Sequence, residues 1–92
     1  MKINYDGQEY TIEEICAPRY RIYCKEIDVY IVLSMEWKGG SYFKIDTVYK
    51  GGKAYSAQRY HYKWIPLCRE ATFIVAKEKG LWDYSNNELK IL

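Results

Sequence analysis

Turn-forming dipeptides divide the chain into short apolar segments, and their spacing constrains the fold more than any other feature. The dipeptides are Asp6-Gly7, Gly39-Gly40, Gly51-Gly52 and Lys79-Gly80. Asp-Gly between two alternating segments is the strongest short-range signal for a β-hairpin, and glycine supplies the positive φ angles that tight turns need. No segment carries a helical stripe longer than about two turns. The sequence therefore favours short antiparallel strands.

Seven or eight segments are expected to be strands. Residues 28–37 are apolar at both sets of alternate positions, which is typical of a central strand covered on both faces. Residues 41–50 place Phe43, Ile45 and Tyr49 on one side, as in a half-buried strand. The other expected strands are residues 2–5, 8–12, 20–25, 71–77, 81–84 and 88–92, and a capping-box pattern over residues 11–14 predicts one turn of helix.

The composition supports the same fold class. The 92 residues are 49% hydrophobic and 28% charged, which is typical of one globular domain spanning residues 1–92. The 11 Tyr and 10 Ile outnumber the 5 Leu, which favours strands over helices. We therefore predict a mostly β protein, a small antiparallel barrel or curled sheet of about seven short strands with at most one or two short helical turns. An α+β fold is the alternative.

Three further features bear on the cellular location. The N-terminal segment lacks the apolar stretch of a signal peptide. The longest apolar run, residues 29–33, is too short to span a bilayer. The chain has 3 Cys, and this odd number does not predict a disulfide framework. The sequence thus predicts a cytoplasmic protein that does not enter a membrane.

Charge is distributed unevenly along the chain. Residues 1–15 carry a local charge of −3, whereas residues 47–69 carry five cations and no acid. Within this basic window, basic and aromatic residues alternate over Arg59, Tyr60, His61, Tyr62, Lys63 and Trp64. This alternation predicts a half-buried strand over residues 59–64, with one basic face and one aromatic face. The sequence leaves open which of the two faces the core.

Three interpretations of the basic window follow. Its aromatic and basic side chains would bind an acidic protein surface, or they would stack bases and track the phosphates of a single strand. Alternatively, the aromatic residues are core and the cations form a solvated face. The pI of 8.4 is below the value of about 9 that nucleic-acid-binding domains exceed, which favours a protein partner. The expected partner-binding residues are Lys53, Tyr55, Arg59, Tyr60, Tyr62, Lys63 and Trp64.

The sequence shows no recognisable catalytic or metal-binding motif. Cys16, Cys24, Cys68 and His61 lack the close ligand pairs of structural zinc sites. The glycine pairs lack the sequence frame of phosphate-binding loops. We therefore predict a non-enzymatic protein without a metal or another cofactor.

The predicted function is that of an inhibitor or adaptor that occludes a surface of a protein or a protein–nucleic acid complex. Small proteins of phages and mobile elements that block host defence offer an analogy at the level of size and composition. Lys53, Arg59 and Lys63 would steer the partner, and the exposed rings of the window would anchor it. The alternative is a small-barrel nucleic-acid-binding protein. Self-association through sheet edges, at residues 88–92 or at the first hairpin, is also open.

Overall fold

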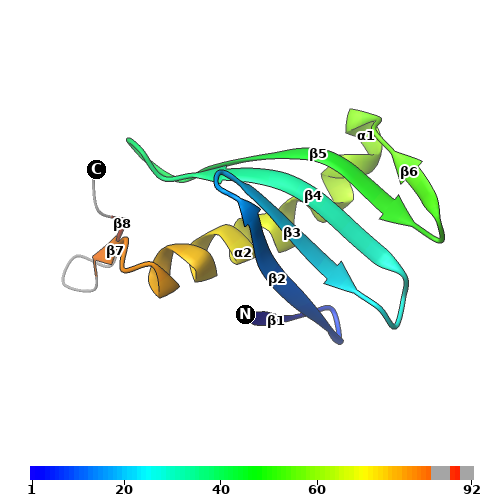
Figure 1. Ribbon diagram of the computed structural model, residues 1–92, viewed down its shortest axis with the longest axis horizontal. Helices are drawn as coiled ribbons and strands as arrows, with labels where there is room; N and C mark the ends of the chain where they lie inside the picture. Colours follow the sequence, from blue (N-terminus) through cyan, green and yellow to red (C-terminus); the bar gives the residue numbers. More distant parts are fainter. Residues whose placement is uncertain (84–87, 90–92) are drawn as a thin grey trace.

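Six antiparallel strands form one open sheet in a computed structural model that describes residues 1–83 and 88–89. The strands follow one another across the sheet in chain order, so each pairs with its neighbours in the sequence (Figure 1). They are β1 (Lys2–Tyr5), β2 (Gln8–Cys16), β3 (Arg19–Cys24), β4 (Val29–Glu36), β5 (Tyr42–Lys50) and β6 (Lys53–Tyr55). The predicted class, a mostly β protein with a curled antiparallel sheet, is confirmed.

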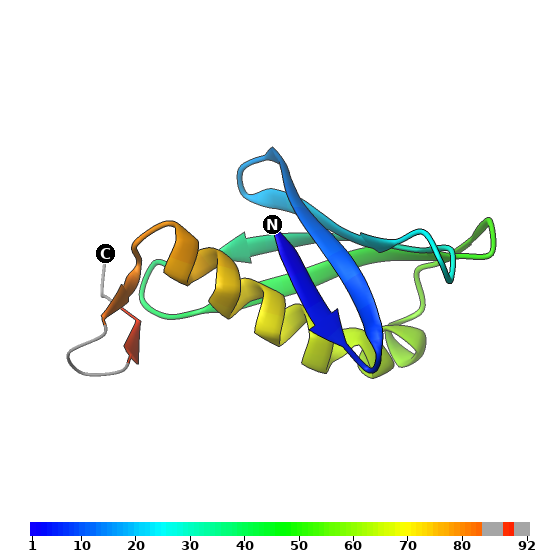
Figure 2. The same cartoon turned by 90° about the horizontal axis from the view of Figure 1, so that it is seen from below.

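A continuous helical segment follows β6 and packs on one face of the sheet. It consists of α1 (Gln58–His61), the 3-10 turn η1 (Tyr62–Trp64) and α2 (Ile65–Glu78). Figure 2 shows this segment lying against one side of the strands. Beyond it, β7 (Trp82–Asp83) and β8 (Glu88–Leu89) pair in a separate sheet of two strands. They fall within the expected strands at 81–84 and 88–92, whose other residues after 83 lie outside the described residues.

The prediction of strands over residues 59–64 and 71–77 is wrong, because both segments are helical. The helical segment runs from Gln58 to Glu78, so the prediction of at most one or two short helical turns is also wrong. The buried side chains recur every three or four residues, at His61, Trp64, Cys68, Ala71 and Val75. That spacing marks one face of a helix, and it extends well beyond the six alternating residues of the basic window.

Pro66 stands inside this helical segment without breaking it. It occupies the first turn of α2, where the missing N–H has no intrahelical partner and the fixed φ suits the helix. The other end of α2 is closed by Gly80, which has a φ of 73°. The Gly80 N–H donates to the Lys77 carbonyl at 3.1 Å, and the Leu81 N–H donates to the Ala76 carbonyl at 2.8 Å. These two bonds form a Schellman motif that satisfies the last carbonyls of the helix.

The glycine-containing turns lie where the sequence predicts them. Asp6 and Gly7 have φ angles of 51° and 78°, and they join β1 to β2 in a two-residue hairpin turn. Gly51 and Gly52 join β5 to β6 in the same way. The single helical turn expected over residues 11–14 is absent, because these residues continue β2 and pair with β3.

The core lies between the helical segment and the inner face of the sheet. In β4, Val29, Ile31, Leu33 and Met35 are buried, whereas the alternate residues from Tyr30 to Ser34 are only half-buried. The prediction that this strand is covered on both faces is therefore wrong. The helical segment packs on one face, and aromatic and β-branched side chains suit the other, half-exposed face as well.

A β-bulge changes the direction of the side chains in β5. Val32 of β4 pairs with Thr47, but Leu33 pairs with Ile45, so β5 contains one extra residue at this point. Before the bulge, Ile45 lies on the core side, and after it Val48 does. Tyr49 is consequently 41% exposed on the opposite face. The prediction that Tyr49 shares a side with Ile45 is wrong, because a bulge inverts the alternation.

Candidate functional site

The sheet face turned away from the helical segment, here called the outer face, carries half-buried and exposed side chains. In Figure 1, α2 passes behind the strands, and the outer face is turned toward the viewer. Strands β2 to β5 contribute a mixture of charged, aromatic and β-branched residues to it. The outer-face residues used below are Glu13, Arg21, Tyr23, Tyr30 and Tyr49.

Three tyrosines lie side by side across the outer face, one from each of β3, β4 and β5. The rings of Tyr23 and Tyr30 are stacked, with centroids 6.1 Å apart and planes inclined by 17°. The ring of Tyr49 meets that of Tyr30 edge to face, at a centroid distance of 5.9 Å. We call these three residues the tyrosine row. Cross-strand aromatic pairs of this kind stabilise a sheet and fix the ring positions.

Arg21 and Glu13 hold the tyrosine row in place through side-chain hydrogen bonds. Arg21 Nε donates to Glu13 Oε2 at 2.9 Å, and a second guanidinium nitrogen donates to the Tyr30 hydroxyl at 3.1 Å. The Tyr23 hydroxyl donates to Glu13 Oε1 at 2.7 Å. The guanidinium carbon also lies 5.9 Å from the ring centroids of both Tyr23 and Tyr30. Each of these polar groups therefore has a fixed partner.

The same contacts determine the charges of the outer face. The hydrogen bond from Tyr23, followed by that from Arg21, lowers the pKa of the Glu13 carboxyl below its ordinary 4.5. The bond to Glu13 raises the pKa of the Tyr23 phenol above 10.0. Glu13 and Arg21 are thus both ionised at neutral pH, and their charges cancel.

The structure separates the aromatic side chains that the sequence placed on one face. Trp64 is 6% exposed and belongs to the core, whereas Tyr62 is 58% exposed. Tyr60 is half-buried and stacks on Tyr55, with centroids 4.2 Å apart. In a helix, residues four apart share a face and residues two apart do not. Tyr60 and Trp64 therefore point one way and Tyr62 another, so Trp64 is not available to a partner.

The cations of the predicted site remain at the surface. Lys53, Arg59 and Lys63 are exposed, and none of them forms an ion pair with another described residue. Lys63 Nζ lies 5.1 Å from the ring centroid of Tyr60. His61 does not join them in a basic row, because it is buried and its Nε2 lies 2.8 Å from the Tyr55 carbonyl oxygen.

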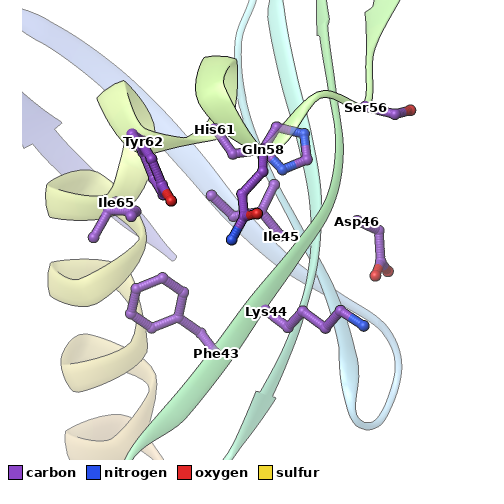
Figure 3. A pocket seen from close by; sticks show the side chains of 9 residues that line it. All are labelled: Phe43, Lys44, Ile45, Asp46, Ser56, Gln58, His61, Tyr62 and Ile65. Carbon is purple, nitrogen blue, oxygen red and sulfur yellow. The ribbon is translucent and has the colours of Figure 1, made fainter.

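A groove of about 610 Å³ lies between β5 and the helical segment (Figure 3). Phe43 and Ile45 of β5 line it from one side, and Tyr62 and Ile65 line it from the other. In Figure 3, the side chains of Phe43, Tyr62 and Ile65 lie between the strand and the helix, whereas Lys44 points to the other side of β5. Ser56, Gln58 and His61 also line the groove, so apolar side chains beside the β5 backbone are combined with polar ones.

The cysteines and the histidine of the sequence do not come together as a metal or thiol site. Cys16 is exposed, whereas Cys24 and Cys68 are buried. Burial raises the pKa of the Cys68 thiol to about 12. In the part of the chain that the structure describes, no group of three or more His, Cys, Asp or Glu side chains could hold a metal ion. No helix among those residues is long and apolar enough to cross a membrane.

Sequence reasoning missed the tyrosine row and Arg21. A signal for them exists, because Arg21 and Tyr23 alternate with the buried Tyr20, Ile22 and Cys24. The period of two separates the two faces of a strand. The row itself depends on which residues face each other across β3, β4 and β5, and the bulge in β5 hides that register from the sequence.

Protein-family models, curated proteins and solved structures were compared with the chain, and none of them matches it. Among the described residues, two surfaces are candidates for binding, namely the outer face with its tyrosine row and the groove beside β5.

Proposed function

We propose that this protein is a non-enzymatic binding protein that covers a surface of a protein partner with the outer face of its sheet, as an inhibitor or adaptor does. The observation that carries this proposal is the tyrosine row on an open sheet face, with Arg21 held against it. Tyrosine and arginine are enriched at the centres of protein interfaces. A tyrosine ring also supplies a large contact area at a small cost in conformational entropy.

The outer face is already ordered before a partner arrives. Glu13 and the Tyr30 hydroxyl fix the guanidinium of Arg21, and cross-strand packing fixes the rings of Tyr23 and Tyr30. Binding therefore requires little further loss of side-chain freedom at this surface. Such preorganisation increases affinity without any additional contact.

The unpaired cations favour an acidic partner. Lys53, Arg59 and Lys63 carry positive charge that no described carboxylate neutralises. Charges at the periphery of an interface mainly accelerate association and select among partners. We therefore infer that these three cations attract the acidic partner, and that the outer face makes the direct contact with it.

A protein that binds single-stranded nucleic acid is the second candidate, because exposed tyrosine rings on a sheet can stack bases. The pairing of the outer-face arginines argues against it. Arg21 is paired with Glu13, and Arg19 lies 3.1 Å from Asp46. Phosphate binding needs cations that are free to replace counterions. The outer face thus suits a protein surface better than a phosphate backbone.

Affinity capture from a lysate of the source cells, with wild type and two tyrosine variants, tests the proposal. Tyr49→Ala removes one member of the tyrosine row, and Tyr62→Ala removes an exposed ring on the other side of the molecule. We expect the captured protein to bind Tyr49→Ala at least about tenfold more weakly than wild type, and to bind Tyr62→Ala unchanged. Equal binding of Tyr49→Ala and wild type contradicts the proposal.

Random single-stranded DNA and RNA at two salt concentrations test the second candidate. Nucleic-acid binding would show an affinity that falls steeply with salt and that is reduced by Tyr49→Ala. We expect no binding of this kind. If the affinity for nucleic acid falls steeply with salt and is also reduced by Tyr49→Ala, the partner is a nucleic acid and not a protein.

A further inference from the structure

The sheet has an open edge along the first part of β5. β5 spans Tyr42–Lys50, but β6 pairs only with its last three residues, from Val48 to Lys50. Among the described residues, no strand pairs with residues 42–47 on that side. An open edge presents a row of backbone N–H and C=O groups, which is a template for another strand. At about 3.3 Å per residue, this edge is roughly 20 Å long.

The open edge borders the groove between β5 and the helical segment. Phe43 and Ile45 are half-buried, and Tyr62 on the opposite wall is 58% exposed. Figure 3 shows these side chains together with Ile65 around the space beside the strand. A strand laid along β5 would place every second side chain against these apolar side chains. Backbone pairing combined with pockets for alternate side chains is the way in which sheets recognise extended peptides.

We propose that this groove binds an extended segment of another polypeptide, which adds to the sheet as a strand next to residues 42–47 of β5. This site lies apart from the tyrosine row and does not depend on the proposed function of the outer face. The bound segment has apolar residues at alternate positions, and these contact Phe43, Ile45 and Tyr62.

The charges beside the edge specify the other alternate positions. Lys44 is exposed, lies on the opposite face of β5 from Phe43 and Ile45, and forms no ion pair with a described residue. The neighbouring Asp46 is already paired with Arg19 at 3.1 Å. The side chains of the added strand on that face would lie across from Lys44, and opposite charges across a strand pair are stabilising. The segment therefore carries Asp or Glu between its apolar residues.

A short peptide suits this edge better than the same edge of a second copy. The bulge between Ile45 and Thr47 interrupts regular pairing, and bulges of this kind limit the pairing of sheet edges. If two copies paired symmetrically about Lys44, the two ammonium groups would oppose each other, which is destabilising. Both features favour a short heterologous segment over a second copy of this chain.

Selection from a displayed library of random short peptides tests the proposal with the intact protein. We expect the enriched sequences to alternate apolar residues with residues that include Asp or Glu. A synthetic peptide of the enriched sequence should bind Tyr62→Ala about tenfold more weakly than wild type. It should bind Tyr49→Ala, the matched control on the outer face, with unchanged affinity. For the proposed function the expected effects are reversed, since Tyr49→Ala weakens binding there and Tyr62→Ala does not. Either proposal can therefore fail without the other.

Single N-methylation along the same peptide tests the backbone pairing. Each peptide carries one N-methyl group, and the methylated position moves along the series. We expect loss of binding at every second position, because only alternate N–H groups of an added strand point toward β5. Hydrogen exchange should slow, when the peptide is bound, at those backbone amides of residues 42–47 that point toward the open edge. Absence of enriched peptides, sensitivity to methylation without a period of two, or binding that is indifferent to Tyr62→Ala overturns the proposal. Concentration-dependent protection of these amides without peptide also overturns it, because a second copy would then occupy the edge.

Discussion

The Lys79 ammonium lies 2.9 Å from the Glu14 carboxylate, and this contact joins the end of α2 to β2. Glu14 also accepts a hydrogen bond of 2.8 Å from the Tyr20 hydroxyl. The bonds from Lys79 and Tyr20 lower the pKa of Glu14 below 4.5, and the bond to Glu14 raises the pKa of Lys79 above 10.5. The pair connects two segments that are far apart in the chain.

The stabilising effect of this ion pair should depend on pH in a defined window. Because the pKa of Glu14 is lowered in the folded state, its contribution is present above 4.5 and is lost as the pH falls through the lowered value. Because the pKa of Lys79 is raised, its contribution is present below 10.5 and is lost as the pH rises through the raised value. We expect Lys79→Met to lower Tm slightly at about pH 7 and not at about pH 2. Lys38→Met, at an exposed lysine without a described ion pair, is the control. An equal loss at both pH values would contradict the prediction.

Trp64→Ala and Tyr62→Ala should differ sharply in stability. Trp64 packs in the core and Tyr62 is exposed, because the segment is helical. We expect Trp64→Ala to lower the free energy of unfolding by about 3–5 kcal/mol. We expect Tyr62→Ala to change it by no more than about 0.5 kcal/mol. Urea denaturation measures both, and a similar loss in the two variants would indicate that the two rings share one environment.

Glu13→Gln should change the titration of Tyr23. The hydrogen bond to the Glu13 carboxylate is the largest cause of the raised pKa of the Tyr23 phenol. A neutral amide removes the negative charge, so we expect the pKa of Tyr23 to fall toward its ordinary value of 10.0. Titration of the tyrosine side chain by NMR measures the shift. Glu9→Gln, which alters a carboxylate paired with Lys2, should leave Tyr23 unchanged. An unaltered Tyr23 titration in Glu13→Gln would show that this hydrogen bond is not formed in solution.

The three cysteines should react with iodoacetamide at different rates in the folded protein. Cys16 is exposed, whereas Cys24 and Cys68 are buried and the pKa of Cys68 is raised to about 12. Because the thiolate is the reactive form, we expect Cys16 to be modified first and Cys68 only when the protein unfolds. Mass spectrometry of peptides after timed alkylation measures the order. Rapid modification of Cys68 without denaturant would contradict the packing of α2 on the sheet.

The sequence predicts the turns and five of the six strands of the sheet because their signals are local, whereas the three-residue β6 was not among the expected strands. Asp6-Gly7 and Gly51-Gly52 adopt positive φ angles, and residues on either side of each pair extend as strands. The helical segment was not predictable from the same local reasoning. Basic and aromatic residues alternate over its first residues, as in a strand. These residues are nevertheless helical, because Trp64 and Cys68 belong to the stripe of buried side chains that continues along α2.

The candidate site was predictable only in part. Charge alone predicts that three cations of the basic window are exposed, namely Lys53, Arg59 and Lys63. The tyrosine row is set by strand register and by a bulge, and the groove is set by how the helical segment packs beside β5. Both are tertiary features that no spacing along the chain specifies.

The strictly sequential order of the six strands has a consequence for how the chain folds. Every strand meets a partner that has just been synthesised, so the sheet assembles from contacts that are close in the chain and should form quickly. The apolar inner face, however, stays open until α2 arrives at the end. We therefore expect Ile22→Val in β3 to slow folding and Leu67→Ala in α2 mainly to accelerate unfolding, as stopped-flow kinetics would show. If Leu67→Ala instead slowed folding, α2 would belong to the folding nucleus. A chain interrupted before α2 would expose the apolar inner face of its sheet, so we expect such a chain to aggregate.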